Sequence, residues 1–206
     1  LLAELFPQAK FLSILRDPRA VAASELHTAW GSRSVGRIVR KWNRVVDQHV
    51  LLQQQLPASR YHLVQYETLV TQPAVVLQRV CDFLGEEFEP AMLRYYDRPA
   101  LEQGFGAHEE WKFKTLKPLD AERIESWRDQ LSLTTMALIQ RAAGERLSRL
   151  GYQPCDTRGV SRLALCRACL LDAGISLYEL LRGVVRPPVR RAPWLWYVQQ
   201  LLANKR

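Results

Sequence analysis

The first thirty residues alternate between apolar runs and helix-breaking positions. Residues 1–5 have the pattern of a helix end, which Pro7 terminates. Residues 10–15 form a short, nearly continuous apolar run, which predicts a strand buried on both faces of a parallel sheet. Asp17 is placed to cap a following helix, and Pro18 fits the first turn of that helix because no amide hydrogen is needed there. We expect this helix to end near Thr28.

The middle of the chain repeats the strand–helix pattern. Residues 29–36 read as a Gly/Ser loop, and a long helix is predicted over 38–55. Its expected apolar stripe consists of Ile38, Trp42, Val45, Val46 and His49. The β-rich alternation over 61–66 predicts a second strand. A helix over 73–84 follows, with Pro73 at its start and Gly85 after its end, and with an expected stripe of Val76, Leu77, Val80, Phe83 and Leu84.

The remaining residues predict helices and irregular segments. Residues 86–119 read as irregular and charged, apart from a short helix at 90–96. Asp120 can cap a short helix that ends at Trp127, and Ser132 can cap a helix over 133–150. Two further helices, at about 159–182 and 193–203, are predicted in the tail.

This order of elements predicts an α/β protein with a mostly parallel sheet flanked by helices. Strands joined through helices pair in parallel with a right-handed crossover. Two strands alone make a poor sheet, so we expect neighbouring strands upstream of Leu1. We divide the chain into a body, residues 1–153, and a basic helical extension, residues 154–206.

Composition and charge narrow the classes of function. The chain has 206 residues, 48% of them hydrophobic, and a net charge of +8. Residues 154–206 contain nine Lys and Arg against three Asp and Glu, whereas the body is almost balanced, so a nucleic-acid partner is not indicated. Four cysteines are too few for a disulfide scaffold. The lone Cys166–Cys169 pair lacks further metal-ligand candidates, so no metal site is predicted.

The chemistry concentrates at the end of the first strand, in the segment FLSILRDPRAVAASEL over residues 11–26. In open α/β sheets, ligands bind outside the carboxyl ends of the strands. Arg16 lies at such an end, and a helix with free amide groups begins directly after it. Ser24 returns to nearly the same azimuth as Asp17 two turns later. Arg16 and Ser24 therefore suit a phosphate group, although an ion pair for Arg16 and a helix contact for Ser24 fit the same positions.

Three segments together resemble one family. The strand followed by RDPR and then Ser24 resembles the 3′-phosphate-binding segment of sulfotransferases that use 3′-phosphoadenosine 5′-phosphosulfate (PAPS). The segment YHLVQYETLVTQPAVVLQRVCDFLG, residues 61–85, resembles the family's strand ending in Tyr-Glu and its following helix. Residues 111–152 are similar to the closing segment of bacterial and carbohydrate-type members, with a basic loop, Trp-Arg and a terminal Leu-Gly-Tyr. The resemblance covers residues 1–153.

The resemblance implies a P-loop-NTPase-like sulfotransferase fold that is incomplete in this chain. Arg16 and Ser24 would hold the 3′-phosphate of PAPS, and Tyr66 would lie near the adenine or its ribose, with a strand-end core aromatic as the alternative. Glu67 would be a structural partner near the strand end. Lys112 would reach the nucleotide or the acceptor, or else be a solvated lysine. Trp127 and Arg128 are interpreted as a packing residue and a salt bridge.

The family's Gly-rich phosphosulfate loop and its general base precede the Arg–Ser segment and are not in these residues. The segment GSRSVGRI, residues 31–38, spaces its glycines like a phosphate loop, but Arg37 and Ile38 replace the required Lys and Ser/Thr. We therefore predict no catalytic residue in the chain and no activity for this fragment alone. The predicted reaction of the intact enzyme transfers a sulfuryl group to a hydroxyl or amine of a small-molecule, carbohydrate or peptide acceptor.

The alternative function is a non-catalytic α/β interaction module whose basic helical tail binds a partner or a membrane. Trp194, Trp196 and Tyr197 beside Arg190 and Arg191 fit peripheral contact with an anionic membrane, and packing on the body or on a partner subunit is the competing interpretation. The sequence shows no apolar run long enough to span a bilayer and no signal peptide. Because Leu1 stands in mid-pattern, we expect a preceding portion, and localisation is weakly constrained, with cytoplasm favoured.

Overall fold

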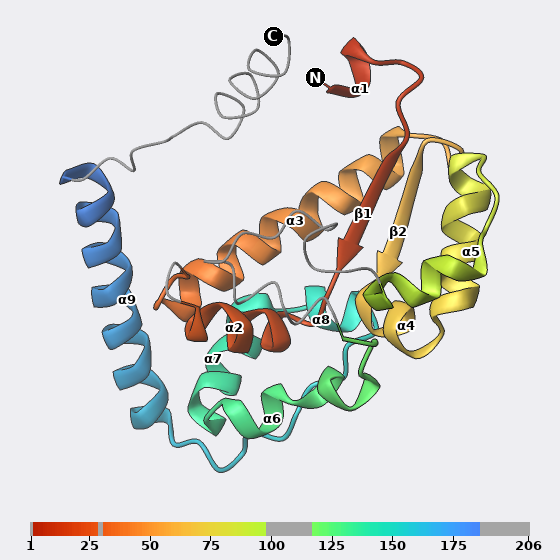
Figure 1. Ribbon diagram of the computed structural model, residues 1–206. Helices are drawn as coiled ribbons and strands as arrows, with labels where there is room; N and C mark the ends of the chain where they lie inside the picture. The colour runs from red at the N-terminus through yellow and green to blue at the C-terminus, as the bar shows by residue number, and fades with distance from the viewer. Residues whose placement is uncertain (1, 29–30, 98–116, 186–206) are drawn as a thin grey trace, which may run out of the picture.

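The computed structural model describes residues 2–28, 31–97 and 117–185. In this part of the chain two strands, β1 (Phe11–Leu15) and β2 (Tyr61–Gln65), form a parallel sheet. Figure 1 shows the two strands side by side, with helices around them and with α2 and α4 beyond their carboxyl ends. The predicted α/β class with parallel pairing is confirmed in this coarse form, although helices dominate the described residues.

The prediction that the first strand is buried on both faces is wrong for this structure. Leu15 is buried, but the side chains of Leu12 and Ile14 are 42% and 56% exposed. Alternate residues of a strand point to opposite faces. The face that carries Leu12 and Ile14 is open in the described part of the chain, so a continuous apolar run here does not mean two covered faces.

The helices that follow β1 begin where their caps lie. After α1 (Leu2–Leu5) and β1, helix α2 (Pro18–His27) starts at the predicted cap, because Asp17 Oδ1 accepts from the Arg19 backbone N–H at 2.8 Å. Helix α3 (Val35–Gln55) starts three residues earlier than predicted. The reason is Ser34, whose hydroxyl accepts from the Arg37 backbone N–H at 3.2 Å and caps the helix.

The predicted stripe of α3 is right except at one position. Ile38, Trp42, Val46 and His49 are buried, whereas Val45 is 40% exposed. Val45 lies 100° from Val46 around the helix, at the edge of the apolar stripe. Buried side chains of α2, α3, α6 and α7 join Leu15 in one hydrophobic core.

The second strand–helix unit differs from the prediction at its junction. The strand ends at Gln65, and Tyr66 begins the short helix α4 (Tyr66–Thr71). Helix α5 (Pro73–Leu84) has the predicted ends, with Gly85 in the left-handed conformation at φ 83°. Its stripe is shallower than predicted, because Val76 is buried but Leu84 is 42% exposed.

The closing part of the body is more broken than predicted. The 3-10 segments η1 (Pro90–Asp97) and η3 (Ala121–Glu125) are followed by α6 (Trp127–Gln130), α7 (Leu133–Ala143) and α8 (Arg146–Arg149). The single helix predicted over 133–150 is therefore wrong. Gly144 interrupts it with φ 59°, a conformation that ends the α-helical hydrogen bonding.

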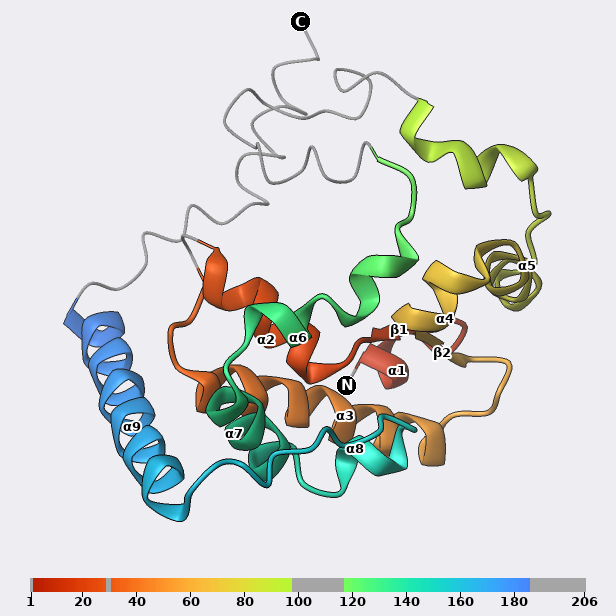
Figure 2. The same ribbon diagram turned by 90° about the horizontal axis from the view of Figure 1, so that it is seen from below.

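The tail contributes one described helix, α9 (Arg162–Val185). It contacts α3 and α7 and lies at the margin of the molecule, as Figure 2 shows from below. No helix in the described ranges is long and apolar enough to cross a membrane. The division at residue 153 stays a prediction, and the helix predicted over 193–203 lies outside the described residues.

Candidate functional site

Strand register brings the candidate residues together. In the parallel pair, Leu15 lies opposite Gln65, so the chain leaves the sheet at the same edge after both residues. Arg16 and Tyr66 directly follow the last residues of β1 and β2, which places them at the carboxyl end of the sheet. The residues that follow the two strands, Arg16 and Tyr66, thus lie in one site because the strands are parallel and in this register.

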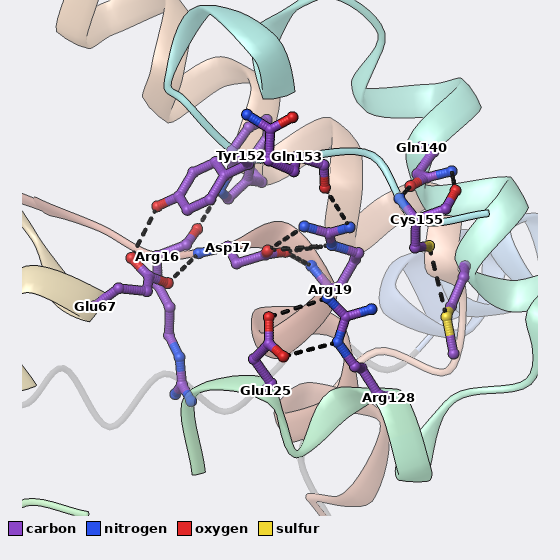
Figure 3. Close-up of polar contacts among 12 residues, drawn as sticks. Arg16, Asp17, Arg19, Glu67, Glu125, Arg128, Gln140, Tyr152, Gln153 and Cys155 are labelled. Atoms are coloured by element: carbon purple, nitrogen blue, oxygen red, sulfur yellow. Dashed lines mark hydrogen bonds and ion pairs between the residues drawn. The ribbon is translucent and has the colours of Figure 1, made fainter. Parts of the chain in front are cut away.

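Arg16 is held by its backbone, while its side-chain Nε is unsatisfied within the part of the chain that the structure describes. The Arg16 carbonyl accepts from the indole N–H of Trp42 at 2.8 Å. The guanidinium carbon lies 4.2 Å from the centre of the Tyr66 ring, a cation–π contact. Arg16 Nε is buried and has no hydrogen-bond partner among the described residues. Figure 3 shows the Arg16 side chain pointing away from the polar contacts around Asp17.

Arg19 has the opposite environment three residues later. Its guanidinium forms a salt bridge with Asp17, with 2.6 Å between Arg19 Nη2 and Asp17 Oδ2, and donates to the Gln153 carbonyl at 2.9 Å. Burial disfavours the charged form of Arg19, but the hydrogen bonds and charge of Asp17 outweigh this effect and raise the pKa of Arg19. Arg19 therefore fixes the start of α2 against the closing segment of the body (Figure 3).

An aromatic side chain covers this ion pair. The Arg19 guanidinium lies 4.1 Å from the ring centre of Trp127, and Arg128 lies 4.5 Å from the same ring. Trp127 is buried, and Arg128 forms a salt bridge with Glu125 at 3.0 Å. The predicted roles of Trp127 and Arg128 in packing and in a salt bridge are confirmed.

Glu67 has the structural role predicted for it. One of its carboxylate oxygens accepts from the Asp17 backbone N–H at 2.8 Å, and the other accepts from the Tyr152 hydroxyl at 3.1 Å. Burial raises the pKa of the Tyr152 phenol well above its ordinary value, and the Glu67 carboxylate raises it further. The end of β2 is thereby tied both to the turn after β1 and to the closing Leu-Gly-Tyr segment.

The structure brings two of the three candidate site residues together. Ser24 lies on α2 with an exposed side chain, seven residues and about 10 Å along the helix axis from Asp17. Among the described residues, no hydrogen bond joins it to Arg16 or Tyr66. Lys112 lies outside the described residues. The segment from Gly31 to Ile38 leads into α3 and meets α9, as described below, and its amides bind carboxylates of this chain.

Sequence reasoning missed the part that the closing segment plays. The Gln153 carbonyl that binds Arg19 and the Tyr152 hydroxyl that binds Glu67 come from residues more than eighty positions away. The available signal was the terminal Leu-Gly-Tyr itself, since a tyrosine that ends a helical segment needs a hydrogen-bond partner when it is buried.

The arrangement suits an anion at Arg16. A buried donor on a permanently charged group, left without a partner, is costly unless a ligand satisfies it. A phosphate group offers oxygen acceptors that match the guanidinium fork, and a nucleobase can lie near the Tyr66 ring. The residues present thus fit the 3′-phosphate end of a nucleotide such as PAPS.

Comparison with known proteins finds similarity to one family. A family model described as "Sulfotransferase family" matches residues 1–90, which contain Arg16, Ser24, Tyr66 and Glu67. Residues 1–90 are therefore similar to the sulfotransferase family. Similarity to individual sulfotransferases extends further along the chain than this match.

Two curated relatives illustrate the extent of the similarity. The chain is 27% identical over 158 residues to protein-tyrosine sulfotransferase from Drosophila melanogaster, covering 73% of this chain and 32% of that protein. It is 25% identical over 200 residues to carbohydrate sulfotransferase 5 from Mus musculus, covering 87% of this chain and 50% of that protein. The chain thus spans a third to a half of the length of these two relatives.

Solved structures agree with the fold. The sulfotransferase domain of the olefin synthase from Synechococcus PCC 7002 is 29% identical with a TM-score of 0.51, over 66% of this chain and 50% of that one. The sulfotransferase domain from the curacin biosynthetic pathway is 23% identical with a TM-score of 0.55, over 71% of this chain and 54% of that one, which indicates a shared fold.

Proposed function

We propose that this chain supplies the 3′-phosphate-binding half of a PAPS-dependent sulfotransferase. The observation that carries the proposal is the Arg16 guanidinium, which lies at the carboxyl end of β1, contacts the Tyr66 ring and has a buried Nε without a hydrogen-bond partner among the described residues. In this proposal Arg16 and the Ser24 hydroxyl donate to the 3′-phosphate, and Tyr66 lies beside the adenine or its ribose.

Each residue of the half-site has a separate task. Arg16 selects a nucleotide with a 3′-phosphate by pairing with its charge, while the Trp42 hydrogen bond holds the backbone of Arg16 in place. Glu67 and Asp17 fix the two strand ends relative to each other. Bound PAPS would supply an activated sulfuryl group. This chain would bind and orient the nucleotide end of that donor, and residues outside the chain would accept the acceptor's proton.

The transfer requires in-line displacement. The acceptor oxygen or nitrogen forms a bond to sulfur while the bond from sulfur to the phosphate oxygen breaks, and 3′,5′-diphosphoadenosine leaves. Positioning and charge stabilisation accelerate such a step, by the logic that applies to phosphoryl transfer. The names of similar proteins refer to protein tyrosine, carbohydrate and an omega-hydroxy menaquinone. We therefore propose a hydroxyl or amine acceptor without assigning its class.

A thermal-shift experiment with 3′,5′-diphosphoadenosine tests the site. We expect the nucleotide to raise the melting temperature of the wild type, and to raise that of Arg16→Ala much less. Arg79→Ala is the matched control, because Arg79 is an exposed arginine on α5. Equal shifts in wild type and Arg16→Ala would remove Arg16 from the site.

An activity measurement separates the two candidate functions. In the proposed function the 206-residue chain binds 3′-phosphonucleotides but transfers no sulfuryl group from PAPS, since it lacks the phosphosulfate loop and general base. Sulfation of any acceptor by the purified chain would contradict the half-site assignment. The rival, a non-catalytic interaction module, predicts no nucleotide-dependent stabilisation at all.

A further inference from the structure

Helix α9 is attached to the body by its polar side. Asp172 Oδ2 accepts from the Ser34 hydroxyl at 3.1 Å and from the Gly36 backbone N–H at 2.9 Å, at the start of α3. The Glu179 carboxylate accepts from the Arg33 backbone N–H at 2.6 Å. Asp172 and Glu179 lie seven residues apart, two helical turns, so they share one side of α9. Both carboxylates are used in these contacts and face the body.

The opposite side of α9 is apolar and exposed. Successive residues turn by about 100°, so Leu163, Leu170 and Leu177 lie on one stripe, roughly 180° from Asp172 and Glu179. The side chains of Leu163 and Leu170 are 81% and 75% exposed. We call this stripe and its flanks the outer face; its exposed large apolar members are Leu163, Leu170, Leu171, Leu177, Tyr178, Leu180 and Leu181.

This polarity is the reverse of that of a surface helix in an ordinary globular protein, which buries its apolar stripe and exposes its charges. A contiguous apolar strip of this kind marks an interaction surface. Figures 1 and 2 show α9 at the margin of the molecule in both views, with one side toward α3 and α7 and the other turned outward.

The exposed charges within and beside the outer face have one sign. Arg162, Arg167 and Arg182 are all exposed on α9, whereas its two carboxylates face the body. After Glu179 the sequence contains no further Asp or Glu, but it has six Lys and Arg residues before the end. Arg162 and Arg182 lie about 100° to either side of Leu163 around the helix, whereas Arg167 lies about 40° from it, within the outer face. The outer face is therefore an apolar strip that carries one cation, is flanked by two others and is followed by a basic sequence.

We propose that the outer face of α9 binds an anionic lipid bilayer, with the helix lying in the plane of the membrane surface. The leucines would enter the boundary between headgroups and acyl chains, and the three arginines would pair with anionic headgroups. The helix is about 36 Å long, and its apolar side is a strip rather than a full circumference, which suits a helix lying on a bilayer. This proposal is independent of the nucleotide site.

Charge complementarity favours the bilayer over a second copy of this chain. Pairing two copies through the same face would bring Arg162, Arg167 and Arg182 of one copy toward the arginines of the other, with no free carboxylate on α9 to neutralise them. Like charges within and beside an apolar seam oppose such pairing. An anionic membrane supplies the opposite charge to all three arginines at once.

Vesicle co-sedimentation of the 206-residue chain tests the proposal. The probes are vesicles of phosphatidylcholine alone and of phosphatidylcholine with about one third phosphatidylglycerol, a fraction that gives a strongly negative surface potential. We expect the wild type to bind the anionic vesicles at least tenfold more tightly than the neutral ones. Salt should weaken this binding, because screening shortens the range of the headgroup attraction.

Three variants separate the contributions. Leu170→Glu with Leu177→Glu should abolish vesicle binding, and Arg162→Gln, Arg167→Gln and Arg182→Gln combined should remove the preference for anionic vesicles. The matched control is Leu51→Glu with Leu133→Glu, which adds two carboxylates at exposed leucines on α3 and α7. It should retain most of the binding. Melting curves of all variants should coincide with that of the wild type, because every substituted side chain is exposed.

Two outcomes would overturn the proposal. One is equal binding of the wild type to anionic and neutral vesicles, or no binding to either. The other is a concentration-dependent dimer in light scattering that the Leu170→Glu, Leu177→Glu variant abolishes, which would assign the outer face to a second copy of the chain.

Discussion

Arg16 and Arg19 stand three residues apart at the same edge of the sheet, yet they have different environments. Arg19 is almost fully buried, with two carboxylate oxygens, a carbonyl and an aromatic ring around its guanidinium. Arg16 has a similar aromatic contact but no polar partner for its buried Nε among the described residues. Hydrogen-bond satisfaction, rather than burial or position, thus distinguishes Arg19, which holds the fold, from Arg16, for which we propose a ligand-binding role.

The largest expected effect comes from breaking the ion pair of Arg19, the arginine whose hydrogen bonds are satisfied. Asp17→Ala removes both the cap of α2 and the partner of buried Arg19, and breaking a buried ion pair in this way costs about 3–5 kcal/mol. Urea unfolding should show this loss of stability. A loss below about 1 kcal/mol would contradict the structural role assigned to the pair.

The next largest effect tests whether Glu67 links the ends of the two strands. Glu67→Ala leaves the Asp17 backbone N–H and the Tyr152 hydroxyl without their acceptor, and we expect a loss of about 2 kcal/mol in the free energy of unfolding. Glu87→Ala, at an exposed glutamate outside the site, is the control and should leave unfolding unchanged. Coincident curves for the two variants would show that Glu67 does not join the strands.

A smaller effect is expected at Ser24, on the ligand side. Ser24→Ala removes one hydroxyl donor to the proposed 3′-phosphate, and a hydrogen bond to a charged group contributes about 1.5–3 kcal/mol at most. We expect roughly tenfold weaker binding of 3′,5′-diphosphoadenosine in calorimetry, with unchanged unfolding because the side chain is exposed. An unchanged affinity would show that Ser24 does not donate to the 3′-phosphate together with Arg16.

The smallest effect concerns pH. The pKa of Tyr152 is raised in the folded state by burial and by Glu67, so its stabilising contribution is complete below the ordinary tyrosine pKa near 10 and declines as pH rises above it. The difference in unfolding free energy between wild type and Tyr152→Phe should therefore narrow from about pH 8 to about pH 10.5. A difference that widens over this interval would have the wrong sign for a buried neutral phenol.

Local patterns predicted the elements that carry this comparison. The caps at Asp17 and Ser132, the Pro73–Gly85 helix and the strand at 11–15 depend on nearest neighbours, and all lie where the sequence indicates. The predictions that were wrong concern features that depend on distant residues or on alternative local conformations. The exposure of Ile14 depends on what covers the sheet, and the break at Gly144 depends on a positive φ that a helical pattern does not reveal.

The candidate site was predictable only in part, for the same reason. The position of Arg16 after an apolar strand is a local feature, and the parallel register then brings Tyr66 to it. That Arg19 rather than Arg16 would take Asp17 as its partner is not visible in RDPR, where Arg16 is adjacent to Asp17 and Arg19 is two residues away. The choice is made by Gln153 and Trp127, which reach Arg19 from the far end of the body.

Nucleotide discrimination tests the central claim most directly. Calorimetry would give the affinities of wild type and Arg16→Ala for 3′,5′-diphosphoadenosine and for 5′-AMP, which lacks the 3′-phosphate. We predict that the wild type prefers the 3′-phosphorylated nucleotide, and that Arg16→Ala reduces this preference by roughly 10- to 100-fold, corresponding to about 1.5–3 kcal/mol, while its unfolding is unchanged. An undiminished preference in Arg16→Ala would contradict the account.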